Sequence, residues 1–132
     1  MENIFKALSD DNRLRIFQLL IHYNLCVCEI ETILDLSQSN VSRHLGKLKS
    51  MNLIQGDKEA QWIHYQISDS FKENHTYLLK YLLDKFNQQP TFINDFRKAK
   101  AYVESPYTCQ TIASDKELVI SHMMQNLSNS NL

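Results

Sequence analysis

Residues 37–51 read SQSNVSRHLGKLKSM, a serine followed by an amphipathic pattern of helical period. The Ser37 hydroxyl can accept a hydrogen bond from a free backbone N–H, which predicts a helix from Gln38 to Met51. One face of this helix carries an apolar i, i+4, i+7, i+10 stripe of Val41, Leu45, Leu48 and Met51. The other face combines amide, hydroxyl and guanidinium groups, which read base edges and bind phosphates. We therefore expect DNA contacts from Gln38, Ser39, Asn40, Ser42, Arg43, His44 and Lys47.

The residues before this helix complete a helix-turn-helix pattern. Ser9-Asp10-Asp11 supplies a cap and acidic first-turn residues for a helix from Asn12 to Tyr23. A short helix over Cys28 to Leu34 then precedes the polar break Asp35-Leu36-Ser37. An apolar cluster of helical spacing, Ile4, Phe5 and Leu8, predicts one further helix at the start of the chain.

A β-hairpin is predicted directly after residue 51. Leu53–Asp57 and the alternating Trp62–Ile67 flank the polar tip Lys58-Glu59-Ala60. A hairpin in this position is a wing, so Lys58 is expected to approach the DNA backbone or minor groove. The alternative is a solvated hairpin tip of mixed charge. The predicted fold is mainly α with a small β-hairpin wing, a winged helix-turn-helix.

Length and composition indicate one compact domain with an appendage. The 132 residues are 43% hydrophobic, and only two glycines and two prolines interrupt them, which favours long helices. Three cysteines and no apolar run long enough to cross a bilayer indicate a cytoplasmic protein with reduced thiols and no membrane partner. The net charge of −1 does not argue against DNA, because DNA responds to the local field of the docking face.

The segment after the wing predicts a homodimer. Between Ser70 and Asn87 the apolar residues form a stripe wider than one core face needs; they are Phe71, Tyr77, Leu78, Leu79, Tyr81, Leu82, Leu83 and Phe86. Two-fold pairing would place two recognition helices on half-sites one helical turn apart, so the double-stranded operator should be an imperfect inverted repeat. The alternative is that this stripe only covers the core of its own subunit.

Several motifs, in order, resemble the ArsR/SmtB family of bacterial metal-sensing repressors over roughly residues 2 to 86. They are Phe5–Asp10, Arg13–Ile16, Leu25–Ile30, Leu36–Leu45 and Trp62–Tyr65. The resemblance implies a homodimeric winged helix that binds its operator without metal and leaves it when metal binds. It also implies that the first helix and the helix after the wing build the dimer interface.

The Cys26-Val27-Cys28 pair matches the thiolate site of the family's arsenic and cadmium or lead sensors. In the arsenic pattern a third cysteine follows three residues later, where this chain has Glu31. The amino-terminal cysteines of the cadmium and lead sensors are also missing from residues 1–25. The family's zinc site after the wing begins with Glu73, Asn74 and His75, but Phe86 and Gln89 stand where its later ligands belong.

The remaining thiol, Cys109, lies in a predicted turn between a helix over Thr91–Glu104 and one opened by the capping box Ser114–Glu117. Three thiolates suit As(III) or Sb(III), whereas zinc prefers four ligands; Cd(II) or Pb(II) remains an alternative. We therefore predict a metal site of Cys26, Cys28 and Cys109, and no organic cofactor. Residues 1–88 are assigned to the DNA-binding and dimerisation domain and 89–132 to a helical extension, disordered from Asn126.

A regular helix cannot present Cys26 and Cys28 together, because residues two apart point about 200° apart. Chelation is therefore expected to unwind or displace the start of the short helix and so lower DNA affinity. Three other hypotheses concern the thiols: a purely structural role, a disulfide or persulfide switch with Cys109, and a thiol enzyme with Cys28 as nucleophile and His22 as base. The chain has no glycine-rich phosphate loop or nucleophile elbow, so we predict that it is not an enzyme.

Overall fold

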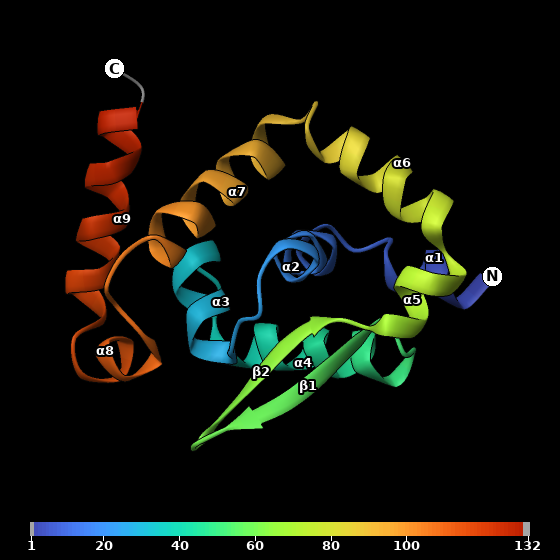
Figure 1. Cartoon of the computed structure of the whole chain (residues 1–132), viewed down its shortest axis with the longest axis horizontal. Helices are drawn as coiled ribbons and strands as arrows, with labels where there is room; N and C mark the ends of the chain where they lie inside the picture. The colour runs from blue at the N-terminus through green and yellow to red at the C-terminus, as the bar shows by residue number, and fades with distance from the viewer. Residues whose placement is uncertain (1, 131–132) are drawn as a thin grey trace.

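The structure is a computed structural model that describes the backbone of residues 2–130 and the side chains of residues 4–127. Helices dominate, and one two-stranded sheet lies on their lower side (Figure 1). Within the described residues no helix is both long and apolar enough to cross a bilayer. The helices are α1 Glu2–Ala7, α2 Asp11–His22, α3 Val27–Leu34, α4 Gln38–Ser50, α5 Asp69–Asn74, α6 Thr76–Phe86, α7 Pro90–Val103, α8 Cys109–Ser114 and α9 Lys116–Ser130.

The predicted helix-turn-helix is present, with boundaries within one residue of those expected. The Asp10 side chain accepts a hydrogen bond from the backbone N–H of Arg13 at 3.0 Å and caps α2. Ser37 caps α4 in the same way, by accepting from the N–H of Asn40 at 3.2 Å. Between α3 and α4 the backbone turns at Asp35, which has a left-handed φ of 55°. The apolar faces of these helices form the core, including the fully buried Phe17, Ile30, Ile33, Val41 and Leu48.

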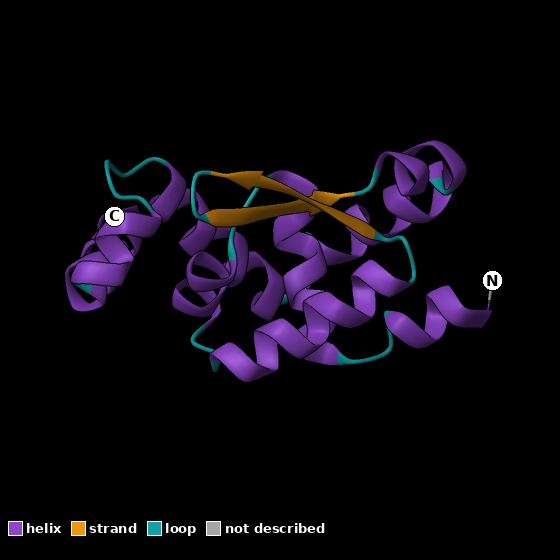
Figure 2. Cartoon of the chain, turned by 90° about the horizontal axis from the view of Figure 1, so that it is seen from below, coloured by secondary structure: helices purple, strands orange, loops and turns teal. Residues whose placement is uncertain are grey.

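The wing is also present, as strands β1 Ile54–Glu59 and β2 Trp62–Ile67. They pair antiparallel, from Ile54 opposite Ile67 to Glu59 opposite Trp62. The hairpin covers one side of the helices (Figure 2). An isolated bridge joins Leu25 to Tyr65, with N···O distances of 3.0 and 2.8 Å. The backbone just before α3 is thus attached to the wing, and the predicted winged helix-turn-helix fold is confirmed.

After the wing, the expected long helix is broken at His75 into α5 and α6. His75 has φ −132° and ψ 43°, outside the helical region, and it separates a six-residue helix from an eleven-residue one. Ser68 caps α5 by accepting from the N–H of Phe71 at 3.1 Å. Phe71, Leu82 and Phe86 are buried, whereas Tyr77 is 87% exposed. Part of the apolar stripe therefore serves the subunit's own core and part of it faces outward.

The C-terminal extension packs against the winged helix. Helix α7 crosses α2, α9 runs beside α7, and α8 lies below both near the start of α3 (Figure 1). Asp95 of α7 receives two hydrogen bonds from the Arg15 guanidinium of α2, at 2.7 and 3.0 Å. Buried Val119 and Met123 hold α9 in place.

Two expectations for the extension were wrong. The segment around Cys109 is not only a turn, because α8 begins at Cys109. Ser114 ends α8 instead of capping the next helix, and Asp115 accepts from the N–H of Leu118 at 3.2 Å in its place. Helix α9 continues to Ser130 and so includes the first positions of the tail for which disorder was expected from Asn126; the last two positions of that tail lie outside the described residues.

Candidate metal centre and DNA-contacting face

Three sulfur atoms meet where the start of α3 faces the start of α8. Cys26 Sγ lies 3.1 Å from Cys28 Sγ and 2.8 Å from Cys109 Sγ, and all three sulfurs lie within 4.8 Å of one another. Cys26 and Cys109 are buried, whereas Cys28 is half-buried. The structure therefore brings the three predicted thiols together within one chain, across 83 residues of sequence.

The sulfurs converge although α3 is intact, so the expectation that chelation must unwind the helix start is wrong. Cys26 is the N-cap residue of α3, with φ −89° and ψ 172°. Its backbone is extended rather than helical, and the angle of about 200° between residues two apart applies only inside a helix. An extended N-cap turns the Cys26 side chain toward that of Cys28.

Glu29 organises the centre, although the sequence analysis did not select it. Its carboxylate accepts a hydrogen bond from the backbone N–H of Cys26 at 2.9 Å, and its other oxygen accepts one from the Tyr102 hydroxyl. His64 Nδ1 of the wing lies 3.7 Å from the first of these oxygens. Glu29 stands three residues after the N-cap, the capping-box position, and that spacing is the signal that could have identified it.

The surroundings keep two of the thiols protonated at neutral pH. Contact with Cys28, together with burial, raises the pKa of Cys26 far above its ordinary value. Burial and the contact with Cys26 raise the pKa of Cys109 in the same direction. Burial and the neighbouring Glu29 carboxylate likewise raise the pKa of Tyr102, so that its hydroxyl stays a donor. The centre thus holds two neutral thiols, Cys26 and Cys109, beside the buried Glu29 side chain.

A surface cleft of about 290 Å³ gives access to the Cys26 and Cys28 side of the centre. It lies among the starts of α3 and α4 and the strand β2; its lining includes Glu31, Gln38, Trp62 and Tyr65. A small solute can therefore reach the thiols between the recognition helix and the wing.

Most of the predicted DNA-contacting residues lie on the surface. Along α4, Gln38, Ser39, Ser42, Arg43 and Lys47 are exposed, and so is Lys58 in the wing. Asn40 is half-buried and accepts a hydrogen bond from the Arg43 guanidinium at 3.0 Å, which orients that side chain. These positions present one polar surface along α4.

His44 does not belong to this surface, and its assignment as a DNA-facing residue was wrong. It is 1% exposed. Its ring nitrogens lie 3.4 Å from Arg13 Nη1 and 3.6 Å from Asp10 Oδ1. Position 44 follows Val41 by three residues and precedes Leu48 by four, so it falls on the buried face of the helix.

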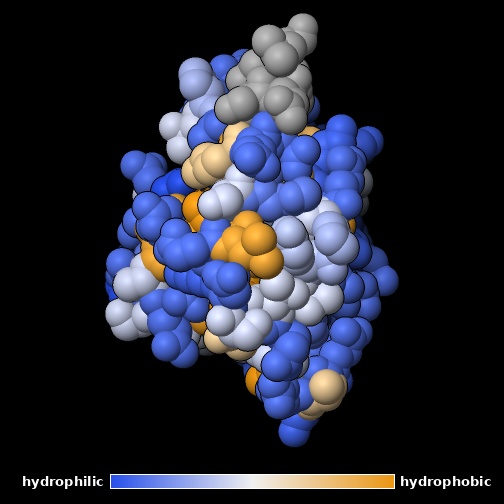
Figure 3. Space-filling model, turned by 90° about the vertical axis from the view of Figure 1, so that its left-hand side faces the viewer, coloured by the Kyte–Doolittle hydropathy of each residue, from blue (hydrophilic) through white to orange (hydrophobic). Residues whose placement is uncertain are grey.

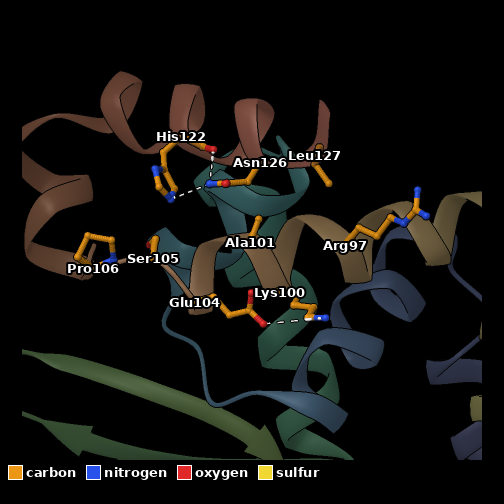
Figure 4. A pocket seen from close by; sticks show the side chains of 9 residues that line it. All are labelled: Arg97, Lys100, Ala101, Glu104, Ser105, Pro106, His122, Asn126 and Leu127. Carbon is orange, nitrogen blue, oxygen red and sulfur yellow. Dashed lines mark hydrogen bonds and ion pairs between the residues drawn. The ribbon is translucent and has the colours of Figure 1, made fainter. Parts of the chain in front are cut away.

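A second cleft, of about 640 Å³, lies between α7 and α9 (Figure 4). Lys100 Nζ lies 4.0 Å from Glu104 Oε1, and Asn126 donates to the backbone carbonyl of His122 at 3.0 Å. No cysteine lines it. The face of the molecule on the side of α8 and α9 is hydrophilic around a small hydrophobic cluster (Figure 3). Since no cysteine lines the cleft between α7 and α9, it is separate from the thiol centre.

The helices α2 to α4 followed by the wing define a winged helix-turn-helix domain. Residues 10–55 match the family described as "Bacterial regulatory protein, arsR family". The chain belongs to this family.

Relatives agree with that assignment. The "Arsenical resistance operon repressor" of Escherichia coli (strain K12) is 44% identical over 66 residues, which are 49% of this chain and 56% of that protein. The solved structure of HlyU from Vibrio cholerae N16961 superposes with a TM-score of 0.54 at 34% identity, covering 61% of this chain and 88% of that chain. The homodimeric winged helix-turn-helix domain Mb0332 from Mycobacterium bovis, a possible ArsR-family transcriptional regulator, gives a TM-score of 0.55 at 26% identity, covering 64% and 78%.

The chain thus spans little more than half the length of the arsenical repressor. The family is described as one of regulatory proteins, and the E. coli relative is a repressor. Cys109 lies outside the residues that the family model matches.

Proposed function

We propose that this protein is a cytoplasmic transcriptional repressor that binds operator DNA as a homodimer and releases it when As(III) or Sb(III) binds Cys26, Cys28 and Cys109. The observation that carries the proposal is the convergence of three sulfurs from α3 and α8 within 4.8 Å. Soft thiolate donors select soft ions, and a set of three leaves no fourth protein sulfur for a tetrahedral metal.

The protonation of the thiols fits arsenous acid as the ligand. Each of the three As–O bonds breaks and is replaced by an As–S bond, and each thiol proton leaves with a hydroxyl group as water. Three waters form for each As(OH)₃ bound, no net proton is released and no atom is oxidised or reduced. Neutral thiols of raised pKa can therefore react without first losing their protons to solvent.

The DNA-binding part of the proposal rests on the exposed polar surface of α4 and on Lys58 of the wing. Arg43 can make a bidentate contact to guanine, while Gln38 and Asn40 offer amide groups of the kind that pair with adenine. Lys47 and Lys58 supply positive charge for phosphates. The expected partner is a double-stranded operator with an imperfect inverted repeat.

The dimer part rests on apolar surface shared by α1 and α6. Phe5 is 57% exposed and Tyr77 87% exposed, and both line an apolar cleft of about 210 Å³ with Ile4 and Leu78. Large exposed aromatic side chains gathered on one surface mark a protein interface. A two-fold axis through this surface would pair the two subunits through α1 and α6.

The link between the thiols and the DNA-contacting face is short. Leu25, which directly precedes Cys26, forms two backbone hydrogen bonds with Tyr65 of the wing, one through its N–H and one through its carbonyl. On the other side, Gln38 of the recognition helix lines the same cleft as Cys28. Shifts of the sulfurs toward a bound ion therefore act on the wing and on the start of α4. Typical coupling free energies of about 1–3 kcal/mol would lower the affinity for DNA roughly 5- to 150-fold when the ion binds. Bound DNA would lower the affinity for the ion by the same factor.

One observation favours a second candidate function, a thiol redox switch. Cys26 Sγ and Cys109 Sγ lie 2.8 Å apart, so a disulfide between them needs little movement. Formation of this disulfide by a peroxide would pass two electrons and the two thiol protons to the peroxide, which leaves as two waters.

The test is release of a labelled inverted-repeat operator during titration with arsenite, antimonite, Cd(II) or peroxide. We expect arsenite to release wild-type protein and to fail with Cys26→Ser/Cys28→Ser and with Cys109→Ser. Ala113→Ser, at an exposed position of α8, is the control and should respond as wild type does. Arsenite release that persists in the double variant would contradict the assignment of the site, and release by peroxide alone would favour the redox switch.

A further inference from the structure

A second group of possible metal ligands shares Cys109 with the three thiols. One ligand atom each from Glu29, His64 and Cys109 lie within 4.8 Å of one another, as the three sulfurs do. Cys109 is common to both groups. An ion bound to Cys109 thus has sulfur donors, a carboxylate and an imidazole nearby.

Charge and coordination number distinguish the ions that such a centre accepts. Three thiolates neutralise As(III) and complete its three bonds, so this ion needs no further ligand. A divalent ion bound by three thiolates carries a net charge of −1 and lacks the fourth ligand of a tetrahedral site. Both oxygens of the neighbouring Glu29 carboxylate already accept hydrogen bonds, from the Cys26 N–H and the Tyr102 hydroxyl. A neutral imidazole offers a lone pair to the ion and adds no negative charge.

The position of His64 suits the role of the fourth ligand. Its Nδ1 points inward, 3.7 Å from Glu29 Oε1, and its Nε2 points outward, 3.7 Å from Glu59 Oε2. A proton on Nε2, directed toward the Glu59 carboxylate, leaves the lone pair of Nδ1 facing the centre. The His64 side chain is only 19% exposed, so much of the water is already excluded from this ring.

We propose that the same centre binds a four-coordinate divalent cation of thiophilic character, such as Cd(II), through Cys26, Cys28, Cys109 and Nδ1 of His64. The inference rests on the proposed function only in sharing its three thiols. Glu59 acts as a positioning residue that holds the imidazole tautomer. Because His64 belongs to β2, a divalent ion bonds the wing directly to α8, whereas As(III) does not.

The experiment compares Cd(II) and arsenite binding to the full chain. Cd(II) is followed by its thiolate-to-metal ultraviolet absorption against a competing chelator. The proteins compared are wild type, His64→Ala and the control His22→Ala, an exposed residue at the end of α2. We expect His64→Ala to weaken Cd(II) binding by about tenfold or more while arsenite affinity changes less than about twofold. His22→Ala should leave both unchanged.

Cadmium NMR of wild-type protein with nitrogen-labelled histidine supplies a measurement that needs no variant. Scalar coupling between bound cadmium and one nitrogen of His64 is the expected result. Its absence, or an unchanged Cd(II) affinity in His64→Ala, would overturn this inference. Loss of arsenite binding in wild type, with the cadmium coupling intact, would instead overturn the proposed function and leave this inference standing.

Discussion

Replacing Arg15 with alanine should loosen the attachment of the C-terminal extension to the winged helix. Arg15 Nε and Nη2 donate to the two oxygens of Asp95 at 2.7 and 3.0 Å, the bidentate geometry of a strong charged pair. The Asp95 side chain is 1% exposed and that of Arg15 is 19% exposed. The hydrogen bonds to Asp95 raise the pKa of Arg15, which shows that the pair favours the charged state. Helix α7, held by this pair, leads to α8 and Cys109.

The magnitude follows from what the variant leaves behind. Removing one partner of a buried pair typically costs about 3–5 kcal/mol, because the other charge stays buried without compensation. Since Arg15 keeps some contact with water, we expect the lower end of this range, about 3 kcal/mol in the free energy of unfolding. Asp95→Asn removes the charge but keeps the shape and should cost less.

Denaturant unfolding followed by circular dichroism measures this loss. The matched control is Lys100→Ala, which removes an exposed pair with Glu104 at 4.0 Å on the same helix. It should cost no more than about 0.5 kcal/mol. Equal losses in the two variants, or a loss below about 1 kcal/mol for Arg15→Ala, would mean that the Arg15–Asp95 pair does not hold α7 to α2.

Three further predictions concern other parts of the molecule. Burial lowers the pKa of His44 below 6.5, so the folded state binds a proton at His44 less readily than the unfolded state does. The His44 contribution to the free energy of unfolding is therefore fully present above pH 6.5 and is lost as the pH drops through the folded-state pKa. In His44→Gln the free energy of unfolding, measured against pH, should fall less steeply over this range. Arg43→Ala should weaken operator binding by about 1–3 kcal/mol in a fluorescence anisotropy titration, and unchanged binding would mean that α4 does not face the bases. Tyr77→Asp should shift the chain toward monomer in sedimentation velocity, because it places a charge on exposed apolar surface; an unchanged dimer would put the interface elsewhere.

Local patterns predicted the winged helix well. The capping side chain of Ser37 and the apolar stripe of Val41, Leu45 and Leu48 depend only on neighbouring residues, and α4 follows both. The wing follows from alternation in Trp62–Ile67 for the same reason. His44 was misplaced because its polarity was given more weight than its helical position, which lies on the buried face of α4.

The centre could be predicted only in part. The metal-binding chemistry of thiols was enough to predict a site of Cys26, Cys28 and Cys109. The approach of α8 to α3 could not be predicted, because it depends on how α7 packs over α2 and not on any local sequence pattern. Treating Cys26 as helical led to the wrong expectation of an unwound α3, since a residue at the N-cap has an extended backbone. Glu29 was missed because its contacts include Tyr102 and His64, which are distant in sequence.

The number of sulfur atoms bonded to arsenic is the most direct test of a three-thiol site. X-ray absorption at the arsenic edge, on protein loaded with one equivalent of arsenite, reports that number. We predict three As–S contacts in wild type and two, with one oxygen in place of the third sulfur, in Cys109→Ser. Two sulfurs in wild type, or three that persist in Cys109→Ser, would contradict a site shared by α3 and α8.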